Sequence, residues 1–426
     1  MRKYAKISSE MEIKRDFYLQ KLLNRRHNGM IKVITGMRRC GKSYLLFNLF
    51  VKALRQEGIG DDHIIQINLE DRRNSALRDP DRLLNYIDSL LVDKQMYYVL
   101  LDEVQMVSEF EDVLNSYLHV ENADVYVTGS NARFLSKDVI TEFRGRGDEV
   151  RIHPLSFMEY KSVRNDAYLE QTLNDYMQYG GLPKVATLAE DAERKTYLGN
   201  LFTQTYLKDI KDRYDIQLDS DLEELVNVMA SGIGSLTNPL KLQNTFKSVK
   251  QSSISQDTIK KYLDYMQDAF LIEKAVRYDI KGRNYISTPA KYYFEDLGIR
   301  NARLNFHQTE QTHLMENLIY NELRMRGYSV DVGQVTLNDK NGEGKSERKQ
   351  LEVDFVCNKG YDRVYIQSAF ALPTEEKREQ EFNSLRRLND GFQKMVVVGG
   401  LQPTYRDDDG IWIVNVFDFL LGKVEL

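Results

Sequence analysis

The chain has 426 residues, of which 42% are hydrophobic and 29% charged, so it is long enough for two or three domains with separate cores. Its formal net charge of -5 argues against a protein that coats nucleic acid or an anionic membrane by charge alone. No apolar run approaches the roughly 18 residues of a membrane span, and the start lacks the apolar core of a signal peptide. Cys40 and Cys357 lie far apart and indicate neither a disulfide framework nor a metal site. These features predict a cytoplasmic protein with no membrane partner.

Short apolar strands alternate with helix-length segments through the first half of the chain. We expect strands at residues 30–35, 63–69, 96–101, 123–128 and 149–154. This alternation is typical of a doubly wound parallel sheet with helices on both faces, an α/β fold.

Helical patterns dominate from about Pro154 to about Tyr214. They are interrupted by "YGGLP" at residues 179–183, where two glycines and a proline end one helix and start another segment. We therefore expect the first domain, with a helical extension, to cover residues 1–214.

A second region, residues 215–305, holds short helices followed by two strands. One helix opens at Ser255, a suitable N-cap, and the strands at residues 271–279 and 283–288 flank the turn "IKGR". The helix that Ser255 opens carries apolar residues at helical spacing: Ile259, Tyr262, Leu263 and Met266. Helices followed by a hairpin predict a winged-helix domain.

The third region, residues 306–426, reads as helix, strand, strand, helix, strand. A charged stretch at residues 338–349 interrupts it and predicts a hairpin tip. This order predicts a separate α/β domain.

The stretch "GMRRCGKSY", residues 36–44, matches the pattern G-x-x-x-x-G-K-[ST] between an expected strand and an expected helix. The glycines allow a tight turn whose N–H groups face an anion, and the helix dipole points at the same place. Lys42 would reach the β- and γ-phosphates, and the Ser43 hydroxyl would hold Mg²⁺. A plain glycine-bearing turn is the alternative. The residues predicted to bind ATP are Gly36, Met37, Arg38, Arg39, Cys40, Gly41, Lys42, Ser43 and Tyr44.

A second signal is the apolar strand "YYVLL", which is followed by Asp102 and Glu103. Two acids at the end of a buried strand are typical of a Walker B segment. Asp102 would hold the Mg²⁺ shell, and Glu103 would polarise the attacking water. Acids at a strand end are also commonly only solvated, so this signal depends on the P-loop.

Two further segments offer polar groups for catalysis. The strand "VYVT" leads into Ser130 and Asn131, which could hydrogen-bond the lytic water or the γ-phosphate. The segment "FRGR" supplies Arg144 and Arg146, and an arginine that reaches a γ-phosphate stabilises transition-state charge. Ordinary loop polarity and a solvated basic turn are the respective alternatives.

The chain resembles the bacterial and archaeal ATPases of the extended AAA class that join a P-loop domain, a winged helix and a C-terminal domain of uncertain role. The matching segments, in the family's order, are "TGMRRCGKSYLL", "LLDEVQ", "VTGSNARFLS", "FRGR", "PLSFMEY", "YGGLP", "KYYFEDLGIRNA", "MENLIYNEL" and "LEVDFV". The resemblance implies ATP and Mg²⁺ as cofactors and a sensor strand beside the P-loop strand. It also favours Asn131 or Ser130 as sensor and an arginine of "FRGR" as finger.

The C-terminal domain resembles the restriction-endonuclease fold, in which a helix acid, a strand Asp and an E-x-K on the next strand gather Mg²⁺. Glu316 and Asp354 match the first two positions, but Gln367 and Ala369 stand where Glu and Lys would be. An amide is a poor Mg²⁺ ligand and alanine carries no charge. We therefore expect this domain to bind without cutting.

The leading hypothesis is an ATP-dependent switch or remodelling subunit that acts on an unidentified protein partner, with a homo-oligomer left open. The alternative is a DNA-binding regulator or defence-type effector with ATP-gated nucleic-acid binding or nuclease activity. DNA contact would use bases of the expected winged helix: Lys260, Lys261, Lys281 and Arg283. Acids share the same helix, so a role as a lid or protein contact stays open: Asp257, Asp264 and Asp268.

Overall fold

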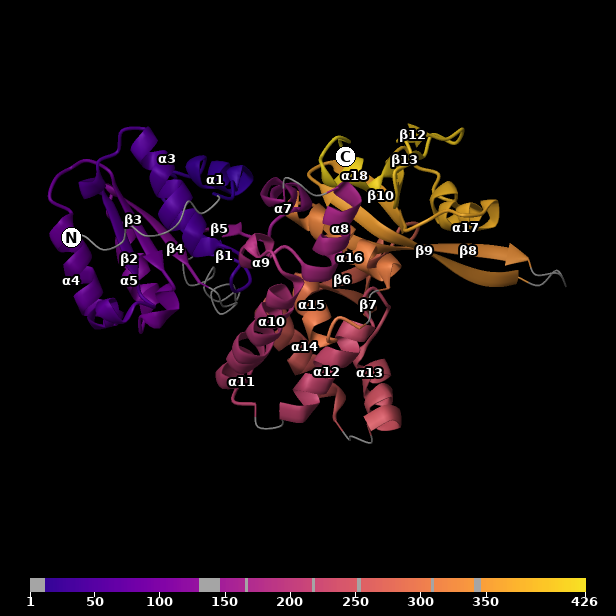
Figure 1. Ribbon diagram of the computed structural model, residues 1–426, viewed down its shortest axis with the longest axis horizontal. Coiled ribbons are helices and arrows are strands. Elements are labelled where there is room, and N and C mark those ends of the chain that lie inside the picture. Colours follow the sequence, from indigo (N-terminus) through magenta and orange to yellow (C-terminus); the bar gives the residue numbers. More distant parts are fainter. Residues whose placement is uncertain are drawn as a thin grey trace. The chain divides into compact units, whose positions relative to one another are not determined.

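The computed structural model describes residues 12–129, 146–164, 168–216, 219–250, 254–307, 310–340 and 346–426. The chain forms two compact units (Figure 1). The first contains residues 1–154 with the short segments Leu182–Lys184 and Asp268–Phe270, and the second contains the other residues.

The first unit is built on a five-stranded parallel sheet with the order β2-β3-β4-β1-β5. Its strands are β1 (Ile31–Thr35), β2 (Ile64–Asn68), β3 (Tyr97–Asp102), β4 (Ala123–Thr128) and β5 (Gly147–Arg151). All five expected strands are confirmed within three residues. The order places β4 between the P-loop strand β1 and the Walker B strand β3, as the resemblance implies.

Helices cover both faces of this sheet, as expected. Figure 1 shows α1 and α3 on one side and α4 and α5 on the other. Leu83, Ile87 and Val113 of α4 and α5 pack against alternate residues of the strands, and the Phe50 ring lies 4.7 Å from that of Tyr126 on the other face. The helices are α1 (Asp16–Leu23), α2 (Lys42–Tyr44), the π-helix η1 (Leu45–Phe50), α3 (Val51–Gln56), α4 (Pro80–Leu90) and α5 (Phe110–Tyr117), with the 3₁₀ turns η2 (Asp61–His63), η3 (Arg72–Arg78) and η4 (Val104–Met106).

The second unit joins a helical part to a large sheet. The helices described after residue 154, two of which (α9 and α14) share end residues with the first unit, are α7 (Phe157–Val163), α8 (Leu169–Tyr179), α9 (Pro183–Thr187), α10 (Asp191–Leu201), η6 (Phe202–Leu207), α11 (Lys208–Tyr214), α12 (Asp219–Ser231), α13 (Pro239–Thr245), η7 (Phe246–Lys250), α14 (Gln256–Asp268), α15 (Leu297–Arg303), α16 (Gln311–Met325), α17 (Glu375–Arg386) and α18 (Val416–Leu420). The start of α14 is confirmed, because the Ser255 hydroxyl accepts the N–H of Thr258 at 3.0 Å. None of the helices in the described ranges has the length and apolar character needed to cross a bilayer.

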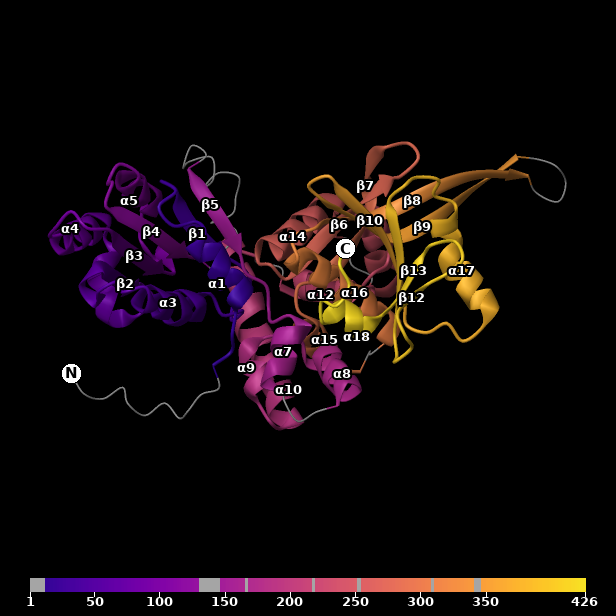
Figure 2. The same ribbon diagram turned by 90° about the horizontal axis from the view of Figure 1, so that it is seen from above.

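The sheet of the second unit has eight strands in the order β12-β13-β11-β10-β9-β8-β6-β7. They are β6 (Ile272–Asp279), β7 (Asn284–Phe294), β8 (Ser329–Lys340), β9 (Ser346–Lys359), β10 (Asp362–Ala369), β11 (Gln393–Val398), β12 (Tyr405–Arg406) and β13 (Trp412–Asn415). Both Figure 1 and Figure 2 show the β8–β9 hairpin extending beyond its neighbours. The ladder between β8 and β9 reaches Lys340 and Ser346, so the two ends of the charged stretch pair with each other, while residues 341–345, the expected tip, lie outside the described residues.

Two features of this sheet differ from the sequence prediction. The expected wing strands, β6 and β7, pair with each other, but β6 also pairs in parallel with β8. The boundary expected near residue 305 therefore does not separate two sheets, because β8 satisfies the backbone groups that a free hairpin edge would expose. The tail also contains more strands than expected: three lie between α16 and α17, and two more follow β11.

The two glycines of "YGGLP" contact the motif "KYYFEDLGIRNA" within the second unit. Asp296 caps α15 by accepting the N–H of Ile299 at 3.0 Å, and it also accepts the N–H of Gly181 at 2.7 Å. Gly180 adopts φ 73°, and a Cβ there would lie 2.2 Å from an Asp296 oxygen. Close packing between the two segments therefore accounts for the glycine at position 180 and the aspartate at position 296.

Candidate functional site

The P-loop connects β1 to α2 and depends on two glycines. Gly36 has φ 137° and Gly41 has φ 104°, conformations that glycine adopts without strain. A Cβ on Gly36 would lie 2.0 Å from the carbonyl oxygen of Ile152. Both its own torsion angle and the neighbouring backbone therefore require a glycine at position 36.

The other P-loop residues differ in what their side chains can reach. Met37 and Cys40 are buried, and the Cys40 thiol donates to the Ile152 carbonyl at 3.6 Å. Their predicted contact with ATP therefore depends on backbone N–H groups. Arg39 and Tyr44 are exposed and Arg38 is half-buried, so these side chains remain accessible from solvent.

Lys42 is buried inside the loop that it follows. Its ammonium donates to the carbonyl oxygens of Gly36 at 2.9 Å and Met37 at 3.0 Å. Both partners are neutral. Since a charged donor bonds more strongly to a charged acceptor, phosphate oxygens would replace these carbonyls as partners.

Asp102 lies beside Ser43 at the carboxyl end of the sheet. Its Oδ1 accepts the Ser43 hydroxyl at 2.8 Å and the Thr128 hydroxyl at 2.6 Å. Burial raises the pKa of Asp102, and the two hydroxyl donors and the nearby Lys42 oppose that shift. A divalent cation held by Ser43 and Asp102 would favour the ionised carboxylate, so this pair fits Mg²⁺.

Glu103 occupies a left-handed backbone conformation, with φ 56° and ψ 51°. Its N–H donates to the Thr128 hydroxyl oxygen at 3.0 Å, and its carboxylate accepts the side-chain amide of Gln105. Thr128 therefore holds both acids, because the same hydroxyl donates to Asp102. Thr128 was not among the residues expected from the sequence, although its place at the end of the strand between β1 and β3 could have indicated it.

Arg15 is a second residue that the sequence analysis missed. Its guanidinium is buried and donates to the Cys40 carbonyl at 3.0 Å and the His153 carbonyl at 2.7 Å. It thus supports the P-loop backbone from outside the motif. We find no local signal in the sequence that distinguishes Arg15 from other basic residues near the start.

Of the predicted sensor and finger residues, Arg146 alone lies in the described part of the chain. Ser130, Asn131 and Arg144 lie outside the described residues. Arg146 is exposed, and its carbonyl accepts the N–H of Ile31 at 3.0 Å, so it stands beside the start of β1. The P-loop follows the other end of that strand, about 16 Å away at roughly 3.3 Å per residue.

The predicted acids of the tail meet around a lysine that the sequence analysis missed. Lys291 of β7 places its Nζ 2.8 Å from Glu316, 2.7 Å from Glu352 and 3.7 Å from Asp354. The strand β10 carries Gln367 and Ala369 where the Glu and Lys would stand, but β7 and β9 bring a lysine and a further carboxylate to the same acids. Lys291 could have been noticed as a lone base within the apolar strand segment "AKYYF".

The two substituted positions have structural roles. Gln367 accepts the N–H of Asp354 at 3.3 Å and donates to Glu381 at 3.2 Å. Ala369 is buried in an apolar core that includes Phe382, so a lysine would not fit at that position. Within the described ranges, no group of three or more His, Cys, Asp or Glu side chains is arranged to hold a metal ion.

Family models match two successive parts of the chain. A model described as an AAA domain matches residues 28–161, and one described as a domain of unknown function (DUF8612) matches residues 170–310. Together with the parallel sheet and the P-loop, the first match identifies an AAA-type P-loop ATPase domain, which belongs to the nucleotide-binding proteins.

Relatives that match most of the chain are also found. An uncharacterized protein of Haemophilus influenzae is 33% identical over 418 residues, covering 97% of this chain and 100% of that protein. An uncharacterized protein of Methanocaldococcus jannaschii is 28% identical over 388 residues, covering 88% and 81%. Among solved structures, the Walker-type ATPase of Pyrococcus abyssi gives a TM-score of 0.48 at 15% identity, covering 70% of this chain and 97% of that one. The chain belongs to the family of the Haemophilus influenzae protein.

Proposed function

We propose that the chain binds ATP together with Mg²⁺ and hydrolyses it. The observation that carries the proposal is the Ser43–Asp102 contact of 2.8 Å, next to the buried Lys42. This arrangement offers a hydroxyl and a carboxylate for a cation and an ammonium for phosphate oxygens at one end of one sheet.

Each residue has a separable role in this mechanism. The P-loop N–H groups bind the phosphates, and Lys42 exchanges its carbonyl partners for the β- and γ-phosphate oxygens. Ser43 and Asp102 hold Mg²⁺, which neutralises phosphate charge when bound. The Glu103 carboxylate polarises the attacking water. The Thr128 hydroxyl, which bonds both the Glu103 N–H and the Asp102 carboxylate, holds the two acids next to each other.

The finger and sensor assignments are part of this proposal. Because Arg146 stands at the opposite end of β1 from its own P-loop, it can reach a γ-phosphate only on a second copy of the chain. We propose this role for Arg144 or Arg146, with Asn131 as sensor. Turnover per chain should then rise with protein concentration, and mixing Arg146→Ala chains with Lys42→Ala chains should restore part of the activity. Turnover that does not depend on concentration would contradict a trans role.

The role of the second unit is also a proposal. The order of elements α16, β8, β9, β10, α17 and β11 supports a restriction-endonuclease-like core over residues 306–426. We propose that this core does not cleave, because the Lys291 ammonium occupies the place among the acids that Mg²⁺ would need. Residues 215–305 supply the helices and hairpin expected of a winged helix. ATP turnover would reposition this unit against an unidentified protein partner in the cytoplasm, as a switch or remodelling subunit. Affinity capture with the Glu103→Gln chain, which should stay loaded with ATP, tests for that partner.

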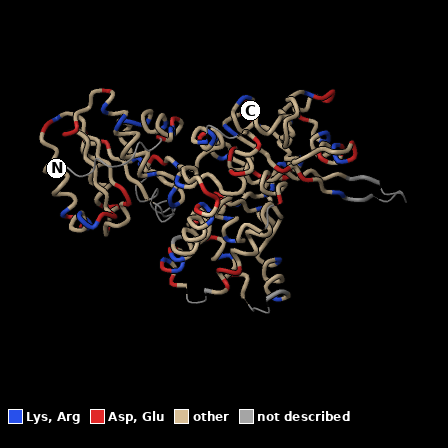
Figure 3. The backbone as a smooth tube through the Cα atoms, in the orientation of Figure 1, with Lys and Arg blue, Asp and Glu red and all other residues tan. Residues whose placement is uncertain are grey.

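The DNA-binding alternative has less support. Lys260 and Lys261 share α14 with Asp257, Asp264 and Asp268, and Figure 3 shows basic and acidic residues interspersed along the described chain. An interspersed surface favours phosphate contact less than a basic face does. Duplex DNA binding at low salt that weakens in Lys281→Ala or Arg283→Ala chains would nevertheless restore this alternative.

Calorimetric titration with ATP and Mg²⁺ tests the central claim. Lys42→Ala should abolish the heat of binding. Lys52→Ala is the matched control, since Lys52 lies in the same helical run but is exposed and pairs with Glu12. Absence of binding by the unmodified chain, or equal affinity in both variants, would refute the proposal.

A further inference from the structure

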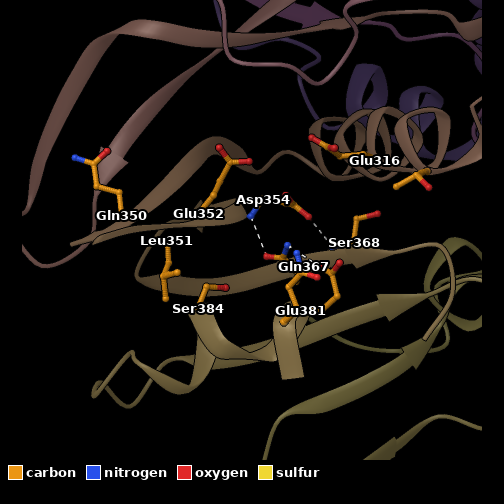
Figure 4. Close-up of a pocket in the computed structure, with 11 residues that line it drawn as sticks. Glu316, Gln350, Leu351, Glu352, Asp354, Gln367, Ser368, Glu381 and Ser384 are labelled. Atoms are coloured by element: carbon orange, nitrogen blue, oxygen red, sulfur yellow. Dashed lines mark hydrogen bonds between the residues drawn. The ribbon is translucent and has the colours of Figure 1, made fainter. Parts of the chain in front are cut away.

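A polar pocket of about 350 Å³ lies in the second unit between α16, α17 and the strands β9 and β10 (Figure 4). Its lining includes four carboxyl groups, those of Glu316, Glu352, Asp354 and Glu381, and a single aliphatic side chain, that of Leu351. The volume suits a small molecule or one long side chain.

The pocket forms where two paired strands separate. Backbone pairing between β9 and β10 ends at Phe355 and Ile366. Beyond that point side chains replace the ladder, because Gln367 accepts the N–H of Asp354 at 3.3 Å and Asp354 accepts the N–H of Ser368 at 2.8 Å. The opening is thus a built part of the fold whose backbone donors are satisfied.

The chain's own Lys291 places a positive charge among the acids of the pocket. It is 3% exposed and contacts Glu316, Glu352 and Asp354. Burial lowers the pKa of Lys291, but the three carboxylates outweigh that effect and raise it overall. The ammonium therefore stays charged and takes the place between carboxylates that a divalent cation would need.

Acceptors remain in excess after this pairing. Lys377 pairs with Glu381, so two ammonium groups face the carboxylates of Glu316, Glu352 and Glu381. Burial raises the pKa of Asp354 to about 8, so this fourth carboxyl group is protonated at neutral pH and is left out of the balance. The Ser368 hydroxyl is buried, with the residue 7% exposed, and it has no hydrogen-bond partner among the described residues. Figure 4 shows this hydroxyl on the side of β10 that faces α16. A buried hydroxyl without a partner costs free energy unless a ligand satisfies it.

We propose that this pocket binds a small organic cation carrying a guanidinium or alkylammonium group, with Glu352, Glu381 and Ser368 as its partners. Such a group offers several N–H donors to carboxylate and hydroxyl oxygens. Phosphate-bearing ligands are disfavoured by the excess of carboxylates. Divalent cations are disfavoured because Lys291 already lies among the acids.

The test uses the full-length chain and agmatine, which carries one guanidinium and one ammonium group, in calorimetric titration at low salt. We expect Glu352→Gln and Glu381→Gln each to weaken binding by about tenfold, and Ser368→Ala by about threefold. Glu376→Gln is the matched control, because Glu376 lies on α17 with Glu381 but outside the pocket. It should leave the affinity unchanged.

Further measurements identify the ligand's source and can overturn the proposal. A short arginine-containing peptide that binds with the same variant pattern would place the cation on a partner's side chain. Absence of binding by agmatine and by the peptide, or affinities that the pocket variants leave unchanged, would overturn it. So would displacement of agmatine by Mn²⁺, since the pocket would then be a metal site.

Discussion

Lys42 and Lys291 are both buried, yet their surroundings differ in a way that separates the two sites. Lys42 donates to two neutral carbonyls of the P-loop, whereas Lys291 lies among three carboxylates. An ammonium with neutral partners can be drawn to a phosphate, while one with charged partners is already neutralised. The first site is therefore prepared for an anion, and the second has no place for one.

The acids of the two sites show the same contrast. Asp102 is held by the hydroxyls of Ser43 and Thr128, groups that can turn toward a cation without breaking the sheet. Asp354 accepts a backbone N–H of Ser368 and lies near an internal ammonium. The first carboxylate can exchange its partners for a metal shell, but the second is part of the strand framework.

The largest expected effect is a loss of stability on substitution of Lys291, which substitution of Lys42 should not cause. Lys291→Met should lower the free energy of unfolding of the second unit by about 3–5 kcal/mol, because it leaves buried carboxylates without their partner. Fluorescence of Trp412, the only tryptophan of the chain and part of β13 in this unit, follows that loss during urea unfolding.

Lys42→Met is the comparison variant. It should change the stability of the first unit by under ~1 kcal/mol, since the ammonium is replaced by an apolar group of similar length and only hydrogen bonds to neutral carbonyls are lost. Amide hydrogen exchange in β1 and β3 measures this change. Equal losses from the two variants would show that the partners of the two lysines do not distinguish them.

A second effect concerns the division of labour between Asp102 and Glu103. Glu103→Gln should keep ATP affinity but lower the hydrolysis rate by about 100-fold or more, because polarisation of water matters mainly in the transition state. Asp102→Asn should also weaken Mg²⁺-dependent ATP binding by about tenfold. Binding and turnover assays on both variants, with the exposed Glu70→Gln as control, check this. Equal loss of ATP binding in both would mean that the roles are wrongly assigned.

The smallest effect is a pH dependence of the second unit. Burial, and then the charge of Glu316, raises the pKa of Asp354 to about 8, whereas an unfolded aspartate titrates near ~4. Between these values the folded state keeps a proton that the unfolded chain releases, so stability falls as pH rises. Between pH 6.5 and 8, the free energy of unfolding should fall by about 1 kcal/mol less in the Asp354→Asn chain than in the unmodified chain. One titrating group can change this free energy by no more than ~1.4 kcal/mol per pH unit.

Urea unfolding at a series of pH values measures this dependence. The control is Asp362→Asn, because Asp362 is an exposed aspartate on β10. Asp296, whose pKa burial raises to about 6, titrates below the chosen range and does not interfere. An unchanged slope in Asp354→Asn would indicate that the carboxyl is ionised throughout, in spite of its burial.

The sequence by itself determined the features that depend on short-range pattern. Five apolar strands, the turn from β1 through Gly36 and Gly41, the acids after β3 and the cap at Ser255 each follow from residues within one turn or one strand, where local sterics and periodicity decide the structure. That information was sufficient for the class of the first unit and for most of the residues that the structure brings together around Lys42.

Only the tertiary structure decided how distant segments meet. Thr128 and Arg15 contribute to the P-loop site through contacts with residues on other elements, and Lys291 reaches the tail acids from β7, not from the strand where an E-x-K pattern would place it. The pairing of β6 with β8 likewise joins segments that the sequence assigned to separate domains. A side chain's charge is visible in the sequence, but its partner depends on which strands pair, because pairing is a property of the whole sheet.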